Sequence, residues 1–231
     1  MASYSGVVGV GHNAGNTAAS TRLALRHGAD AVEIDVIALG GQLYAGHSIP
    51  ARSLSRRLYQ GPRLSEAWDA AGDAAVIQLD IKQSAARLPR LLLAFLAERA
   101  DDREVIVSSA DPSLLRQIAT EVPSVRRFLS VPDRASLDRL QEDLALVAIL
   151  DGVTIHHALL DEPTMGWLRA RGLRVFVWTV NDVERINELV RLGVDGVTTD
   201  NLAILELLGD PQPTGLKLAR RLPAPRAYAL P

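Results

Sequence analysis

The 231-residue chain contains no cysteine, which excludes a disulfide framework and thiolate chemistry. Long apolar runs are also missing: the longest, at 91–97 and 144–150, are far too short to span a bilayer. The net charge is only −2, which argues against a protein that binds nucleic acid over its surface. The first ten residues lack the basic region that opens a signal peptide. We therefore expect a soluble, cytoplasmic protein with no nucleic-acid partner.

What the chain does contain is a regular alternation of short β-branched segments and segments with helical spacing. The predicted strands lie at 6–11, 30–37, 74–81, 104–109, 124–131, 152–156, 173–180 and 195–199. The predicted helices lie at 16–27, 64–71, 85–100, 112–121, 133–149, 162–171, 183–192 and 201–208. Eight such units predict an α/β fold, a TIM (β/α)8 barrel that forms a single domain at 1–208. A short extra strand at 42–46 turns back after the second strand, and a Pro-rich, basic tail follows at 209–231.

Acidic side chains mark the second and third predicted strands. Side chains alternate along a strand, so Glu33 and Asp35 share one face of the apolar segment 31–39. Burying such a pair requires a metal ion or a basic group between the carboxylates, and a salt bridge to a neighbouring strand is the simpler alternative. Asp80 adds a third acid at the end of the next strand, and this all-oxygen set suits Mg²⁺ or Ca²⁺ better than zinc. Lys82, on the face of Asp80, either balances the three acids or neutralises a phosphate oxygen.

Ring side chains gather at the same ends of the predicted strands. His12 follows the first strand and His47 follows the short extra one, and two such imidazoles can act as general base and general acid on one substrate. Trp178 ends the seventh strand, and His156 and His157 end the sixth, so one of the two histidines is expected to line the same pocket. The C-terminal strand ends form the active face of a barrel.

The glycines of the first turn invite a different interpretation. Gly9, Gly11 and Gly15 follow a strand, and Asp35 stands about 20 residues further on, as in dinucleotide-binding folds. In that motif a single acid closes the second strand, whereas here Glu33 and Asp35 both lie inside it. The paired acids therefore favour the barrel over a dinucleotide site.

The chain resembles the glycerophosphodiester phosphodiesterase family. The resemblance runs through His12, the stretch NTAASTRLALRHGADAVEID, His47, DIK at 80–82, IVSSADPSLLR at 106–116, VFVWTVND at 175–182 and GVDGVTTD at 193–200. It implies a barrel that holds a divalent cation, Mg²⁺ or Ca²⁺, through Glu33, Asp35 and Asp80, with His12 and His47 as acid and base. Cleavage of glycerophosphodiesters to glycerol phosphate and an alcohol is the implied reaction. We expect Lys82, Asn13 and Trp178 to contact the substrate.

Several positions depart from the family pattern. The family usually has Arg and Gly after its first histidine, where this chain has Asn13 and Ala14, and its His-Asp pair is His47-Ser48 here. The loop around Gly15 is also shortened. These departures lean toward the related sphingomyelinase D type, so a lysophospholipase D-like or sphingomyelinase D-like enzyme that releases a lipid head group, through a cyclic phosphate or by hydrolysis, is one alternative. A catalytically impaired barrel that binds a phosphodiester without cleaving it is another.

Basic residues cluster in two segments that the barrel pattern does not need. Segment 49–63 carries four arginines and no acid directly after His47, and the tail at 209–231 carries one lysine and three arginines among its prolines. One interpretation is a solvated loop and a loose strap. The other is a peripheral contact with anionic substrates or a membrane surface, because clustered charge raises the local concentration of an anionic partner. The sequence does not specify an oligomeric state.

Overall fold

The computed structural model describes residues 6–48, 61–72, 74, 76–82, 86–100 and 103–209. The predicted tail beyond residue 209 and the arginines of segment 49–60 lie outside the described residues. No helix in the described ranges is long and apolar enough to cross a membrane.

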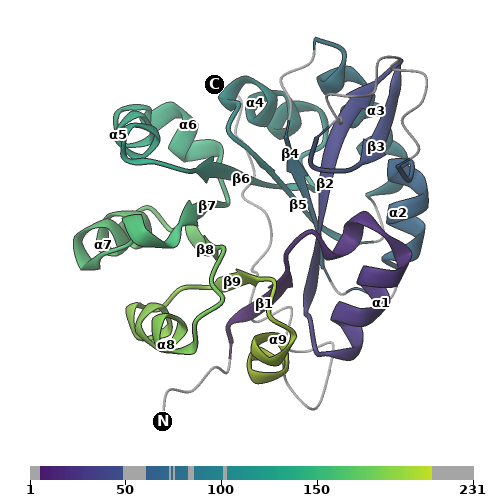
Figure 1. Ribbon diagram of the computed structural model, residues 1–231. Coiled ribbons are helices and arrows are strands. Elements are labelled where there is room, and N and C mark those ends of the chain that lie inside the picture. The colour runs from purple at the N-terminus through teal and green to yellow at the C-terminus, as the bar shows by residue number, and fades with distance from the viewer. Residues whose placement is uncertain are drawn as a thin grey trace.

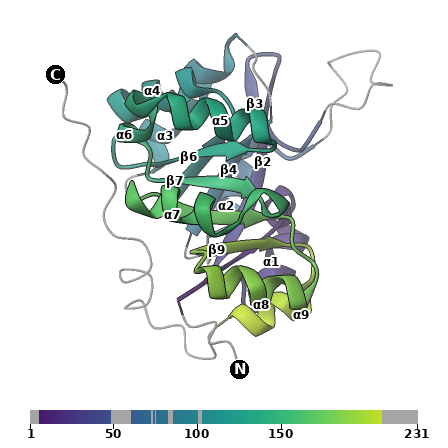
Figure 2. The ribbon, with the colours of Figure 1, turned by 90° about the vertical axis from the view of Figure 1, so that its left-hand side faces the viewer.

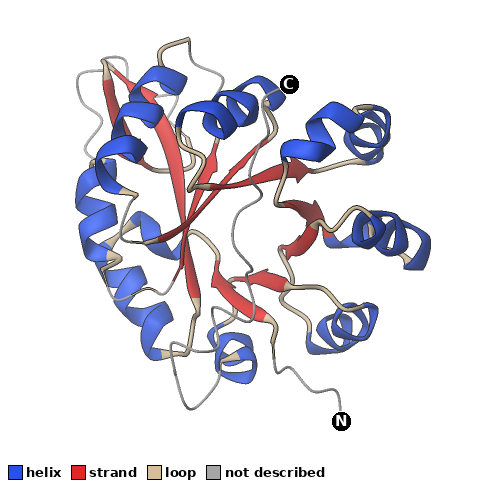
Figure 3. Cartoon of the chain, turned by 180° about the vertical axis from the view of Figure 1, so that it is seen from behind, coloured by secondary structure: helices blue, strands red, loops and turns tan. Residues whose placement is uncertain are grey.

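Parallel strands form a closed barrel with helices around its outside (Figures 1 and 3). The barrel strands are β1 (Val8–Gly11), β2 (Ala31–Leu39), β4 (Val76–Ile81), β5 (Glu104–Ser109), β6 (Arg126–Val131), β7 (Gly152–His156), β8 (Arg174–Trp178) and β9 (Gly196–Thr199). Around the ring they follow the order β1-β9-β8-β7-β6-β5-β4-β2, and pairing between β1 and β2 closes it. Strand β3 (Gln42–Ala45) pairs antiparallel with the far end of β2. The predicted TIM barrel and its extra strand are thus confirmed.

The helices form the outer layer, as the side view of β6, β7 and β9 behind α5, α7 and α8 shows (Figure 2). They are α1 (Ala18–Arg26), α2 (Leu64–Ala70), α3 (Leu88–Arg99), α4 (Pro112–Glu121), α5 (Arg134–Glu142), α6 (Leu144–Ile149), α7 (Glu162–Ala170), α8 (Val183–Leu192) and α9 (Leu202–Leu208), with short 3-10 turns η1 (Ala14–Asn16) and η3 (His157–Leu159). The prediction of one helix over 133–149 is wrong. Asp143 ends α5, and its carboxylate accepts from the backbone N–H of Leu146 (2.8 Å), which starts α6. A local side-chain cap therefore overrides the continuous helical spacing.

An apolar layer fills the middle of the barrel. Its members come from six strands and pack together out of contact with solvent: Val8, Val10, Ala31, Val76, Ile106, Phe128 and Phe176. The two phenylalanine rings meet edge to face with centroids 5.1 Å apart. Gly152 and Gly196 make room for them, since a Cβ at either position would lie within 2.8 Å of a ring atom. Toward the C-terminal strand ends the inward positions become polar, so the apolar layer closes the barrel beneath a polar chamber.

Candidate active site

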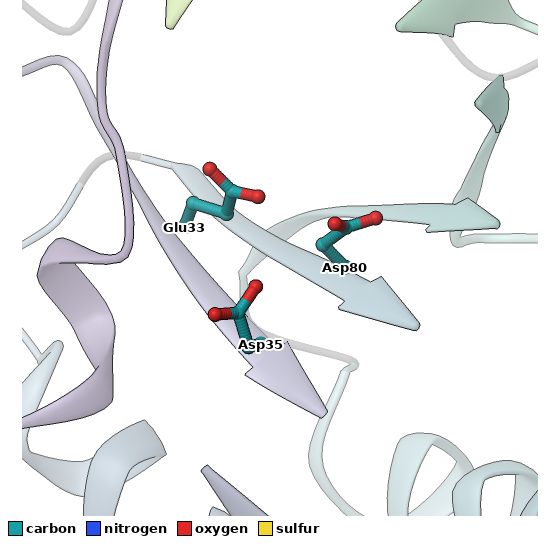
Figure 4. Close-up of side chains that lie close together, drawn as sticks. All are labelled: Glu33, Asp35 and Asp80. Atoms are coloured by element: carbon teal, nitrogen blue, oxygen red, sulfur yellow. The ribbon is translucent and has the colours of Figure 1, made fainter. Parts of the chain in front are cut away.

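The three predicted metal ligands lie together on β2 and β4, toward the end of the segment over which these two strands pair. Asp35 and Asp80 are direct partners in the parallel register, and Glu33 stands one inward position earlier on β2. One carboxylate oxygen of each residue lies within 4.8 Å of the other two, and Figure 4 shows the three groups facing one space. Glu33 and Asp35 are 4% and 0% exposed, and Oε2 of Glu33 has no hydrogen-bond partner among the described residues. Hard oxygen donors with an unsatisfied buried oxygen fit a divalent cation, so this cluster could bind a metal.

The ammonium of Lys82 enters the same space. Its Nζ lies 3.1 Å from Oδ1 of Asp35 and 3.9 Å from Oε1 of Glu33, and it also pairs with Asp80. Burial by itself lowers the pKa of Lys82, but the three carboxylates outweigh burial and raise that pKa above its ordinary value. For Glu33, burial and then the charge of Asp80 raise the pKa well above its ordinary range, against the lowering effect of Lys82.

The short loop after β1 holds Asp35 in place. Nδ2 of Asn16 donates to Oδ2 of Asp35 (3.0 Å), and Oδ1 of Asn16 accepts from the backbone N–H of Asp35 (2.8 Å). Asn13 has a positive φ of 54°, which asparagine tolerates, and its carboxamide lies between the carboxylate of Asp35 and Nε2 of His12, 3.2 Å from the latter. Gly15 permits this close packing, since a Cβ there would lie 2.3 Å from Cγ1 of Ile34. Two amides thus fix one carboxylate of the cluster.

A carboxylate directly after the last barrel strand orients His12. Nδ1 of His12 lies 2.7 Å from Oδ1 of Asp200, so Nδ1 carries the proton in this contact. Asp200 is held in turn by Asn181, whose Nδ2 donates to its carboxylate (3.1 Å) and whose Oδ1 accepts from its backbone N–H (2.9 Å). Nε2 of His12 then faces Asn13. Sequence reasoning did not assign a role to Asp200, although it follows β9 and ends the GVDGVTTD segment of the family resemblance.

One cavity of about 440 Å³ brings these residues together at the C-terminal end of the barrel. Six of the predicted site residues line it: His12, Glu33, His47, Asp80, Lys82 and Trp178. The remaining two, Asp35 and Asn13, lie behind this lining and contact Lys82 and His12. Polar side chains also line the cavity, four on strands of the barrel and one directly after β8: Gln78, Ser130, Thr154, Thr198 and Thr179. We expected His156 or His157 to line the cavity, and this prediction is wrong: neither is among the described residues that line it. The ring of His156 instead contacts Trp178.

Several known proteins are similar to this chain in sequence or in fold. Glycerophosphodiester phosphodiesterase GDPD4 of Arabidopsis thaliana is 27% identical over 112 residues, which cover 48% of this chain and 34% of that protein. The chain spans only about a third of the length of the curated relatives that it matches. Among solved structures, an Oleispira antarctica phosphodiesterase in complex with the product sn-glycerol-3-phosphate superposes with a TM-score of 0.72 at 22% identity, covering 87% of this chain and 96% of that one. A glycerophosphodiester phosphodiesterase from Agrobacterium tumefaciens gives a TM-score of 0.68 at 19% identity and covers 87% and 98%.

These structural likenesses establish the fold. The sequence itself matches the model of the glycerophosphoryl diester phosphodiesterase family over residues 72–204, more than half of the chain. The match includes Asp80, Lys82, Trp178 and Asp200, and thus one of the clustered acids and the partner of His12. By this match the chain belongs to the glycerophosphoryl diester phosphodiesterase family.

Proposed function

We propose that this protein is a metal-dependent phosphodiesterase that cleaves small glycerophosphodiesters to glycerol phosphate and an alcohol. The observation that carries the proposal is a single cavity lined by a carboxylate cluster, a lysine and two histidines. Family membership and the named relatives support a phosphodiester as the substrate class. The glycerol phosphate held by the Oleispira antarctica protein supports a small polar product.

Glu33, Asp35 and Asp80 are the residues that would hold the divalent cation, and their oxygen donors favour Mg²⁺ or Ca²⁺. When bound, such a cation supplies positive charge at a phosphoryl oxygen. With the cation bound, the carboxylates that Lys82 now pairs with would have a second positive partner. The ammonium of Lys82 would then be able to interact with the phosphate as well. Its raised pKa keeps the ammonium protonated throughout the neutral range.

His12 and His47 are the proposed base and acid. Asp200 holds the Nδ1 proton of His12, which leaves Nε2 to take a proton from the attacking hydroxyl or water, and the carboxylate stabilises the imidazolium that forms. His47 lines the same cavity from the segment after β3 and is exposed, so it can exchange protons with solvent and donate one to the departing alcohol oxygen. The departures at Asn13 and Ser48 leave both imidazoles in the cavity.

The test is turnover of a soluble glycerophosphodiester by chelator-treated protein with and without added Mg²⁺ or Ca²⁺, with products identified by phosphorus NMR. We expect glycerol phosphate to appear only with the metal. A cyclic phosphate as the end product, or preference for a lysolipid in a parallel assay, would support the lipid-directed alternative. Saturable binding of the diester without any turnover would support the impaired barrel and refute the proposed reaction.

A further inference from the structure

The cavity has two chemically different walls. The clustered acids stand on β2 and β4, and the strands four places away around the eight-membered ring are β7 and β8. On that far side the described lining carries no charged side chain and consists of Thr154, Trp178 and Thr179, with Ser130 and Pro132 beside them on and after β6. A phosphate attracted to Lys82, and to the cation that the acids would hold, therefore faces an indole across the cavity.

The indole of Trp178 is held by its strand neighbour. His156 on β7 is the register partner of Trp178 on β8, and the two rings meet edge to face, with centroids 5.4 Å apart and planes at 86°. This geometry places the positive edge of one ring against the negative face of the other. His156 does not itself line the cavity, so its contact acts on the substrate only through Trp178.

His156 is in turn fixed from behind. Its ring stacks on His157 with centroids 4.9 Å apart, and its Nδ1 accepts from the backbone N–H of Ala158 (3.4 Å). Arg185 of α8 donates to the carbonyl of His157 (2.5 Å) and to its Nδ1 (3.4 Å). Burial, and then the charges of His156 and Arg185, lower the pKa of His157, so this ring stays neutral and packs without charge repulsion. A continuous series of contacts therefore connects Arg185 on α8, through His157 and His156, to Trp178 at the cavity wall.

We propose that His156 is a positioning residue that holds Trp178 as the surface on which the alcohol arm of the phosphodiester packs. This inference rests on the proposed function and adds to it a residue that acts on the substrate through Trp178. The polar side chains Gln78, Ser130 and Thr154 suit the glycerol arm, which keeps hydroxyl groups in the diester. An indole face suits an arm with C–H surface, and best of all an alkylammonium group, which is attracted to an aromatic face. A diester with an alkylammonium arm is therefore a sensitive probe of the Trp178 surface and of the residue that holds it.

Two diesters that share the glycerophosphate group and differ in the alcohol, methyl or trimethylammonioethyl, provide the test. We expect His156→Ala to raise KM for the ammonium diester about 2- to 10-fold, the range of one edge-to-face contact, with kcat within twofold and the methyl diester unaffected. His156→Phe keeps an aromatic ring and should restore KM. His27→Ala is the matched control, because His27 pairs with Glu206 between α1 and α9 outside the cavity.

A double-substitution cycle separates positioning from an independent effect. The losses from His156→Ala and Trp178→Ala should not add, since both remove the same wall. Additive losses, equal effects on the two diesters, or no rescue by His156→Phe would overturn the inference while leaving phosphodiesterase activity intact. Tryptophan fluorescence titrated with the ammonium diester gives a second measure: the quenching lost in Trp178→Phe should also shrink in His156→Ala. If wild-type protein neither cleaves nor binds either diester, the proposed function and this inference are both wrong.

Discussion

Replacing Lys82 with methionine removes the positive charge that lies among the three carboxylates. Lys82 Nζ stands 3.1 Å from Asp35 and 3.9 Å from Glu33, separations at which unit charges interact by about 4–5 kcal/mol at an effective dielectric of about 20. Methionine keeps the packing of the stem but leaves the acids to repel one another. Removing one partner of a buried ion pair costs about 3–5 kcal/mol, so we expect metal-free Lys82→Met to lose stability on this order.

The same substitution should strengthen metal binding. A cation that enters the wild-type cluster is repelled by the ammonium, and in Lys82→Met this repulsion is gone. Proton uptake by Glu33 offsets part of the gain, because its pKa is already raised by burial and by Asp80. We expect at least tenfold tighter binding of Mg²⁺ or Ca²⁺, which corresponds to about 1.4 kcal/mol.

Chemical denaturation in chelator and in excess metal, together with titration calorimetry, measures both effects. Arg134→Met is the control, because Arg134 makes an exposed ion pair with Asp138 on α5 and its loss should change neither quantity measurably. If Lys82→Met binds metal no more tightly than wild type, or is equally stable without metal, then Lys82 does not balance the charge of the cluster, and the structural argument for its role fails.

Three further outcomes are expected. Because the folded-state pKa of Glu33 is raised, Glu33 takes up a proton on folding. The free energy of unfolding of the metal-free protein should therefore fall as pH rises above about 4.3, the ordinary pKa of Glu. Denaturant melts of Glu33→Gln should lack this part of the pH dependence. Asp200→Ala should lower kcat about tenfold or more with KM nearly unchanged, because it frees the imidazole of His12, and a pH–rate profile identical to wild type would contradict this positioning role. His12→Ala and His47→Ala should each lose roughly 10²- to 10⁴-fold in rate with circular dichroism unchanged, and near-full turnover by either variant would require a different acid or base.

Local patterns in the sequence determined the architecture and the placement of the three clustered acids. Alternation of strand and helix spacing predicts the barrel, because each period reports which face of an element is buried. Strand alternation likewise places Glu33 and Asp35 on one face, and the position of Asp80 at a strand end predicts its place beside them. These features need only residues near one another in the chain, and they were confirmed.

Only the tertiary structure decided how the site residues are paired. Asp200 lies 188 residues from His12, and the two meet because β9 is the parallel neighbour of β1 in the barrel. Strand registers also set the contacts of Lys82 with the three acids and of His156 with Trp178. The spacing of residues along one strand does not specify how that strand is aligned with its neighbour. The break at Asp143 was also hidden, because a cap and a helical surface residue use the same amino acid. Periodicity specifies faces, whereas the registers that set these contacts form only when distant strands pack around one core.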